Sequence, residues 1–426
     1  MTTLKAVRGT RDLLPPETAL WNRIEATARS VFARYNFGEI RTPVFEDTSL
    51  FARGVGEETD IVSKEMYTWE DRARAQSEKT QSLTLRPENT AGVVRAYIEH
   101  GLGESGQLQK LYYIGPQFRR ERPQKGRYRQ FSQIGAEVIG PPSAGSESPL
   151  RDAEVLEMLA TLLDELGITG WTLELNSVGS AADRGRYNDA LRAALVPVVG
   201  QMCVDCQRRA VTNPLRVLDC KIPADQPIID TLPVIADSLD EASKAHFAAV
   251  TEALDAANVP YTRNHRLVRG LDYYTRTTFE FTHGGLGAQN ALLGGGRYDG
   301  LSEMLGGPRA PGIGFAMGED RLVLTLLAQE QKLAQLADAY IAPLGETLNA
   351  AALQLARELR HHGLWIELGE GSFRLKKSFE AADKTARQIV ILGEDELKSG
   401  ILTVKNFSTG TQTKVPRAEL AVFLSN

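Results

Sequence analysis

A dense run of basic side chains is the first part of this 426-residue chain that could carry chemistry. Its basic and aromatic members are Phe118, Arg119, Arg120, Arg122, Lys125, Arg127, Tyr128, Arg129 and Phe131. A run of this kind is more often a solvated loop than a site. The net charge of -5 argues against a general polyanion binder, which would usually be basic overall. If RNA is a partner, positive charge must be concentrated locally, and this run qualifies.

Two glycine-rich stretches could bring the backbone close to a ligand. Residues 294–300 contain four glycines and could by themselves be simple turns. Residues 311–321 place small side chains ahead of Arg321, at the expected start of a helix. Glycine permits close approach of backbone to ligand, and a guanidinium group suits a phosphate. Together the two stretches favour a phosphate site over turns alone.

Two shorter clusters each have an ordinary structural explanation. Residues 267–274 hold an arginine, a carboxylate and two tyrosines, which a strand with aromatic packing would also explain. Residues 86–90 could be a helix cap, with Asn89 or Thr90 starting the helix. Neither cluster identifies a site alone.

The three cysteines raise the question of a zinc site. Cys203 and Cys206 have the spacing of a metal-binding pair, and Cys220 follows. A structural zinc ion needs four ligands, and the nearby histidines, His246 and His265, stand at unhelpful spacing. We therefore expect the cysteines to be small packing residues, with no zinc. Three cysteines also cannot form a full disulfide framework, which favours a reducing cytoplasm.

Several classes of protein are disfavoured by what the sequence lacks. No Gly-Lys dipeptide occurs, so there is no phosphate-binding P-loop. Residues 101–106 match a dinucleotide pattern but follow a helix and precede a strand, which inverts the required context. Hydrophobic residues make up 42% and charged residues 24%, as in folded globular proteins. We find no secretory signal and no membrane-spanning run.

Hydrophobic periodicity predicts the elements that position these motifs. Strands over 111–114 and 131–139 flank the basic run, which makes it a loop between strands. Two further apolar runs predict a hairpin with a mobile tip over 70–79. The remaining expectations are helices at 17–35, 90–99, 152–166 and 319–331, strands at 39–42, 171–175 and 277–281, and a helical insertion over about 181–260.

The C-terminal part of the chain has a different pattern of secondary structure. Strands and helices alternate there, which predicts a small α/β domain around a largely parallel sheet. The predicted elements are strands at 339–342, 364–368 and 388–392 and helices at 347–360 and 375–384. We therefore divide the chain into residues 1–331, a linker at 332–338, and residues 339–426.

Taken together and in this order, the motifs resemble those of class II aminoacyl-tRNA synthetases, and specifically the histidyl-tRNA synthetase family. The resemblance covers nearly the whole chain. The matching stretches are residues 8–15 (the family's opening), 39–46 (motif 1), 118–131 (motif 2), 312–321 (motif 3), and 267–274 and 295–299 (both histidine-specific). It implies an α+β catalytic core built on an antiparallel sheet, with the helical insertion, and assigns residues 339–426 to an anticodon-binding α/β domain.

The resemblance implies ATP-dependent ligation of L-histidine to tRNA(His) through histidyl adenylate, with release of AMP and pyrophosphate. The attacking carboxylate is already a nucleophile, so positioning and positive charge are what the site must supply. The implied catalytic residues are Arg269 and Arg119. ATP would meet Arg119, Glu121, Arg127, Phe131 and Arg321, and Mg²⁺ would bridge its phosphates.

Histidine recognition is also implied by the resemblance. Glu137 and Tyr274 would contact the imidazole, where unpaired polar groups reject other amino acids. The rest of the implied histidine site comprises Glu88, Asn89, Thr90, Gln133 and Tyr273.

The resemblance further implies RNA contacts and an assembly. Arg122 and Gln124 would face the acceptor end of tRNA, where histidine tRNAs carry an extra 5′ guanosine. A homodimer through motif 1 is expected by analogy. Basic residues of the final domain could face RNA or simply be solvated, namely Arg374, Lys376, Lys377 and Lys384.

One relative with the same core is a non-catalytic regulatory subunit of ATP phosphoribosyltransferase. It usually lacks the final domain and several ligand-facing residues. The domain is present here and Arg119, Arg127, Arg269 and Arg321 are intact, which disfavours this alternative.

Overall fold

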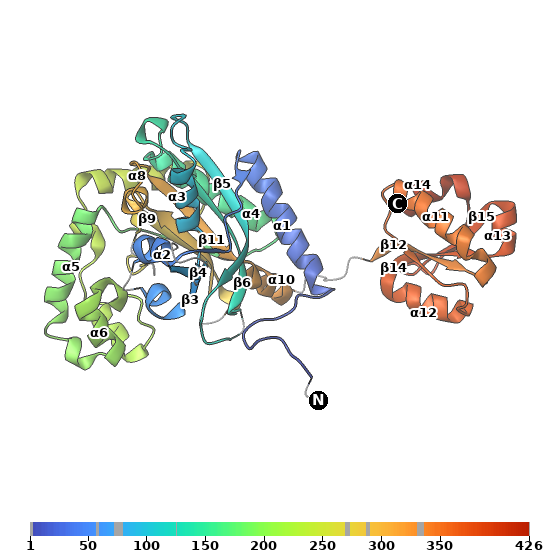
Figure 1. Cartoon of the computed structure of the whole chain (residues 1–426), viewed down its shortest axis with the longest axis horizontal. Helices are drawn as coiled ribbons and strands as arrows, with labels where there is room; N and C mark the ends of the chain where they lie inside the picture. The colour runs from blue at the N-terminus through green and yellow to red at the C-terminus, as the bar shows by residue number, and fades with distance from the viewer. Residues whose placement is uncertain are drawn as a thin grey trace. The chain divides into compact units, whose positions relative to one another are not determined.

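The computed structural model divides into two units, Met1–Gln331 and Lys332–Asn426, each with its own sheet (Figure 1). The residues that it describes are 3–56, 59–71, 80–124, 126–268, 273–286, 290–329 and 336–425. Most of the linker expected at 332–338 lies outside these residues.

An eight-stranded sheet is the framework of the first unit, in the order β1-β5-β6-β11-β10-β9-β7-β8. The strands are β1 (Gly38–Glu39), β5 (Gln109–Phe118), β6 (Gln130–Ile139), β7 (Trp171–Ser177), β8 (Thr262–Arg263), β9 (Thr275–His283), β10 (Ala291–Arg297) and β11 (Gly312–Gly318). Neighbouring strands from β5 to β7 in this order pair antiparallel, whereas the two-residue edge strands β1 and β8 pair in parallel. The predicted antiparallel core is therefore confirmed.

Three helices pack together on one face of this sheet. They are α1 (Glu17–Arg34), α4 (Pro149–Glu165) and α10 (Glu319–Ala328), and they contact one another, β6 and β11. The predicted apolar stripe of α1 is buried in full, as Leu20, Trp21, Ile24, Ala28, Val31 and Phe32. The ring centroids of Phe32 and of Phe315 in β11 lie 6.2 Å apart. The other face of the sheet remains available for a site.

A small sheet, three helices and a π-helical turn lie near that second face. The strands β2 (Phe45–Asp47), β4 (Gln81–Leu85) and β3 (Tyr67–Asp71) are antiparallel neighbours, so the predicted hairpin is confirmed. Most of its expected mobile tip lies outside the described residues. The associated helices are α2 (Thr48–Val55), the π-helical turn η1 (Ile61–Glu65), α3 (Thr90–Glu99) and α9 (Leu301–Met304).

The predicted helical insertion is also present, between β7 and β8. Figure 1 shows α5 and α6 on the opposite side of the first unit from α1 and α10. Its helices are α5 (Ala181–Leu195), α6 (Val204–Thr212), α7 (Gln226–Ile229) and α8 (Glu241–Ala256), joined by the 3-10 turns η3 (Val199–Gln201), η4 (Pro214–Val217), η5 (Pro223–Asp225) and η6 (Ile235–Ser238). Its apolar core is continuous with Tyr273, Tyr274 and Tyr298. Two more 3-10 turns, η2 (Pro142–Ala144) and η7 (Gly284–Leu286), complete the unit's described elements.

The second unit has a five-stranded sheet in the order β13-β12-β14-β15-β16. Its elements are β12 (Ala337–Pro343), η8 (Glu346–Leu348), α11 (Asn349–His361), β13 (Ile366–Leu368), α12 (Leu375–Thr385), β14 (Ala386–Leu392), α13 (Glu394–Ser399), β15 (Ile401–Asn406), β16 (Gln412–Pro416), η9 (Arg417–Glu419) and α14 (Leu420–Ser425). The first three strands are parallel, as predicted, but β15 and β16 add an antiparallel hairpin. That hairpin was missing from the sequence prediction because β16 buries only Val415 and so lacks apolar alternation.

None of the described helices is long and apolar enough to cross a membrane.

Candidate active site

Alternate residues of β6 form the floor of a pocket. Phe131, Gln133, Gly135 and Glu137 share one face of the strand because strand side chains alternate. The neighbouring strand β11 pairs Gly314 with Glu137, so the glycine lies on that same face. Intervening residues of both strands face the opposite side, toward α1, α4 and α10.

Most of the glycines predicted as turns or close-approach points prove to be strand residues, in β10 and β11, and Gly135 of β6 adds another strand glycine beside them. A Cβ at Gly314 would lie 1.6 Å from Oε2 of Glu137, and one at Gly135 would lie 2.3 Å from the Tyr113 hydroxyl. Glycine is therefore required at both positions, despite its poor strand propensity. It leaves room above the sheet for polar side chains and a ligand.

A cavity of about 230 Å³ opens over this floor. A cavity of about 150 Å³ already admits benzene, so this one can hold part of a small substrate. Ten residues predicted from the sequence line it together: Glu88, Thr90, Arg119, Glu121, Arg127, Phe131, Gln133, Tyr273, Tyr274 and Arg321. Other lining residues include Tyr113, Tyr128, Tyr298 and Asp320, none of which the sequence analysis selected.

One end of the cavity carries guanidinium groups beside an aromatic ring. The Arg119 guanidinium lies 5.2 Å from the Phe131 ring centroid, and its Nε donates to the Pro87 carbonyl at 2.8 Å. Arg321 is the third residue of α10 and donates from Nη1 to the Ala291 carbonyl at 2.5 Å. The Arg127 guanidinium pairs with Glu121 at 3.0 Å. Fixed positive charge at this end suits a phosphorylated ligand.

Behind the lining residues Thr90, Tyr113 and Tyr298 at the other end lies the buried carboxyl group of Glu137, which is not itself part of the cavity lining. Thr90 Oγ1 donates to its Oε1 and the Tyr298 hydroxyl to its Oε2, both at 2.7 Å. Burial raises the pKa of Glu137 to about 8. Loss of water opposes the charged form, although both hydrogen bonds favour it. The ionisable tyrosines around it, Tyr113, Tyr273 and Tyr298, also have pKa values well above the ordinary range because of burial.

The helix cap expected at residues 86–90 is made by a different side chain. Asn89 is the cap residue of α3 but makes no side-chain cap bond, and its Oδ1 accepts from Thr42 at 2.9 Å. Glu88 instead accepts from the backbone N–H groups of Thr90 and Ala91 at 2.7 and 3.0 Å. Burial raises the pKa of Glu88. Asn89 is not part of the cavity lining, unlike its two neighbours.

Two buried polar atoms in the cavity wall lack a protein partner. Among the described residues, neither the Tyr113 hydroxyl nor Oε1 of Gln133 makes a hydrogen bond. Buried polar groups are nearly always paired in folded proteins. Because both residues line the cavity, their vacant bonding positions fit a polar ligand.

The N-terminal segment fixes the basic loop to α10, which the sequence analysis did not foresee. Arg11 pairs with Asp320 at 2.8 Å and with Glu17 at 2.9 Å. Its guanidinium lies 4.8 Å from the Tyr128 ring centroid. No local pattern could have revealed the contacts of Arg11 with Asp320 and Tyr128, because they join residues more than a hundred positions apart.

The remaining predicted site residues do not line the cavity. Arg122 and Gln124 are exposed on the loop between β5 and β6, where the backbones of Gln124 and Arg127 bond to each other at 2.9 and 3.1 Å. Arg269 lies outside the described residues.

An antiparallel sheet carrying a glycine-floored cavity with arginines at one end is the architecture of a class II aminoacyl-tRNA synthetase. A model of the histidyl-tRNA synthetase family matches residues 9–322, and one of an anticodon-binding domain matches residues 338–426. The chain therefore belongs to the histidyl-tRNA synthetase family.

Similar proteins span its full length. The chain is 72% identical to a histidine–tRNA ligase of Koribacter versatilis, over 99% of this chain and 96% of that protein. It is 56% identical to one of Solibacter usitatus, over 99% of both. The solved structure of apo S. aureus histidyl-tRNA synthetase covers 100% of both chains, with 38% identity and a TM-score of 0.78.

Proposed function

We propose that this chain is a histidine–tRNA ligase that activates L-histidine with ATP and transfers it to tRNA(His). The observation that carries the proposal is a single cavity with two chemically different ends, arginines beside Phe131 at one and, at the other, Thr90 and Tyr298, whose hydroxyl groups donate to the buried Glu137 behind them. An enzyme that joins an amino acid to a nucleotide phosphate needs both ends within one site.

ATP occupies the arginine end. Arg119 holds the α-phosphate and Arg321 the γ-phosphate, and Phe131 and Arg321 enclose the adenine. Glu121 accepts from the adenine amino group, and Arg127 faces phosphate. The support is that these side chains line one end of the cavity.

Mg²⁺ accompanies the ATP phosphates and neutralises part of their charge. The phosphate oxygens are the kind of ligand that Mg²⁺ prefers at a nucleotide site.

Histidine occupies the Glu137 end. Glu137 holds a proton in the ligand-free protein, and a cationic imidazole beside it would favour the ionised form, whose remaining lone pairs can accept from an imidazole N–H. Gln133 offers an unpaired acceptor to the α-amino group, near Glu88 and Thr90. Tyr273 and Tyr274, with rings 4.8 Å apart, close the pocket. Asn89 supports the pocket from outside its lining, because its Oδ1 accepts a hydrogen bond from Thr42.

The reaction needs charge stabilisation and alignment more than a base. The histidine carboxylate attacks the α-phosphorus and pyrophosphate departs, while Arg119 balances negative charge on the phosphoryl oxygens. Arg269 contacts both the carboxylate and the α-phosphate. That role rests on the family resemblance of residues 267–274.

The tRNA is held at two places. Arg122 and Gln124 extend from the exposed loop toward the acceptor end. The second unit binds the anticodon, and the exposed basic residues of α12 and its cap contribute, namely Arg374, Lys376, Lys377 and Lys384.

The protein acts as a homodimer in the cytoplasm. Motif 1 leads into β2, and exposed apolar side chains gather near this strand. They are Val44 just before β2, Phe45 at its start and Trp69 in β3, and the Phe45 and Trp69 ring centroids lie 6.0 Å apart. An exposed apolar cluster of this kind suits a subunit interface. The three cysteines are free thiols, in keeping with a reducing compartment.

Aminoacylation of a tRNA(His) transcript with labelled histidine tests the function against the regulatory-subunit alternative. We expect ATP-dependent charging of this transcript and none of a non-cognate transcript. Stimulation of an ATP phosphoribosyltransferase without any charging would favour the regulatory subunit.

A further inference from the structure

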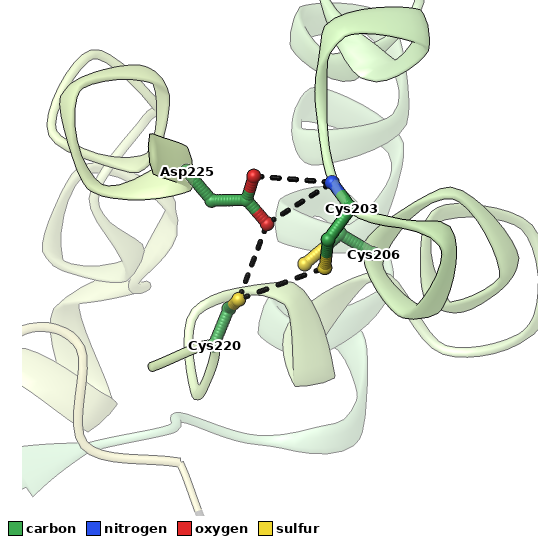
Figure 2. Close-up of side chains that lie close together, drawn as sticks. All are labelled: Cys203, Cys206, Cys220 and Asp225. Atoms are coloured by element: carbon green, nitrogen blue, oxygen red, sulfur yellow. Dashed lines mark hydrogen bonds between the residues drawn. The ribbon is translucent and has the colours of Figure 1, made fainter. Parts of the chain in front are cut away.

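Three thiols and a carboxylate converge inside the helical insertion (Figure 2). Cys203 caps α6, Cys206 lies in its first turn, Cys220 follows η4, and Asp225 ends η5. Their four ligand atoms all lie within 4.8 Å of one another. Asp225 is the fourth donor that the sequence analysis did not find when it considered only histidines.

The spacing of these atoms fits a tetrahedral metal ion. The Sγ atoms of Cys203 and Cys220 are 3.9 Å apart, and Cys220 Sγ lies 3.2 Å from Asp225 Oδ2. Zinc–sulfur bonds of about 2.3 Å in a tetrahedron place sulfur atoms about 3.8 Å apart. Small side-chain movements would therefore enclose an ion.

The surroundings of Asp225 argue against simple packing of small apolar thiols. Its side chain is 1% exposed, and no basic side chain in the described part of the chain pairs with it. Its oxygens accept from the backbone N–H of Cys203 and from the Cys220 thiol. A buried carboxylate is normally neutralised by a cation or a metal ion. The thiols carry no positive charge, so they cannot neutralise the Asp225 carboxylate.

A further contact would stabilise a metal-bound thiolate at Cys220. The backbone N–H of Ile222 donates to Cys220 Sγ at 3.4 Å. Metal-bound thiolates are commonly stabilised by such outer hydrogen bonds.

We propose that Cys203, Cys206, Cys220 and Asp225 bind one Zn²⁺ ion that stabilises the insertion. Four protein ligands close the coordination shell, as in structural rather than catalytic zinc sites. The ion joins the start of α6 to the chain on both sides of η5, and none of its ligands lines the active-site cavity. Thiol protons, including the one that Cys220 shares with Asp225, leave as the ion binds.

Metal analysis of the full-length protein, purified under reducing conditions and incubated with Zn²⁺, tests the site. We expect one zinc ion per chain after gel filtration. Cys206→Ser and Asp225→Asn should lose most of it. Leu218→Ala, a buried apolar truncation in the same core with no donor removed, should retain it. Wild-type zinc no higher than that of Cys206→Ser would overturn the proposal.

Cobalt substitution keeps the test valid if a cysteine variant does not fold. Co²⁺ added to the thiol-reduced, zinc-free wild-type chain should give thiolate-to-metal charge-transfer bands and tetrahedral d–d bands. Zinc should then displace the spectrum. A Cys203–Cys220 disulfide in the protein as purified anaerobically, or a spectrum without thiolate bands, would contradict the site.

Discussion

Gly314 of β11 lies directly beside Glu137 of β6, and even one methyl group on the glycine would overlap the glutamate carboxyl oxygen. The pairing joins a residue of motif 3 to the proposed imidazole-binding carboxyl group. The shape of the pocket therefore depends on the absence of a Cβ atom at residue 314.

Gly314→Ala should weaken histidine binding by displacing Glu137 from Thr90 and Tyr298. Overpacking typically costs about 1–3 kcal/mol, so the KM for histidine should rise on the order of 10–100-fold. Gly318→Ala is the matched control in the same strand, because its new Cβ would meet no atom closer than 3.9 Å. Equal KM values for histidine in the two variants would refute this role of Gly314.

Glu137→Gln should flatten the dependence of stability on pH. The pKa of Glu137 rises from an ordinary 4.5 to about 8 on folding, so the folded chain holds a proton that the unfolded chain releases. Wild-type stability is unaffected by this group below about pH 4.3 and falls as pH rises toward 8. Each pKa unit is worth about 1.4 kcal/mol.

The difference in unfolding midpoint between pH 5.5 and pH 8 should therefore be smaller for Glu137→Gln than for the wild type, without substrates. Glu104→Gln, on an exposed turn, should follow the wild type. If the unfolding midpoints of all three proteins changed equally with pH, burial would not be what holds the proton on Glu137.

Arg269→Ala should abolish most adenylate formation without destabilising the chain. Removing one charge-stabilising donor typically lowers the rate by about 10²–10³-fold. Arg266→Ala is a suitable control, since Arg266 pairs with Asp230 and Gln226 of the insertion and not with the cavity. Histidine-dependent pyrophosphate exchange and thermal unfolding would be measured for both. Near-normal exchange in Arg269→Ala would exclude the catalytic role.

Gln124→Ala and Arg122→Ala should slow transfer to tRNA while sparing adenylate synthesis, because both side chains are exposed outside the cavity. The advantage of tRNA with the extra 5′ guanosine should shrink in each variant. Single-turnover transfer with tRNAs that have or lack that guanosine provides the measurement. Unchanged discrimination would mean that the loop is only a solvated connection.

Local patterns predicted much of this fold because they reflect which face is buried. The stripe of α1 and the strands flanking the basic loop follow from spacing alone. The strands β10 and β11 were harder to predict. Their glycines leave space for side chains of a neighbouring strand, and in the sequence alone such glycines look like turn residues. The exposed strand β16 lacked an apolar pattern.

The residues of the candidate site also divide into those that a local sequence pattern reveals and those that it does not. Residues within motifs, such as Arg119 and Thr90, could be selected from the sequence. Tyr298 and Arg11 lie in matched stretches too, but their contacts with Glu137 and Asp320 could not be predicted, because these contacts span 161 and 309 positions. Asp225 was missed because a carboxylate is the least expected ligand beside three cysteines.

Histidine-dependent exchange of pyrophosphate into ATP tests the central claim most directly, since it needs both ends of the cavity but no tRNA. Each amino acid would be offered to the wild-type chain with ATP and Mg²⁺. We expect exchange with histidine and background rates with every other amino acid. Absence of exchange with saturating histidine, or equal exchange with another amino acid, would contradict it.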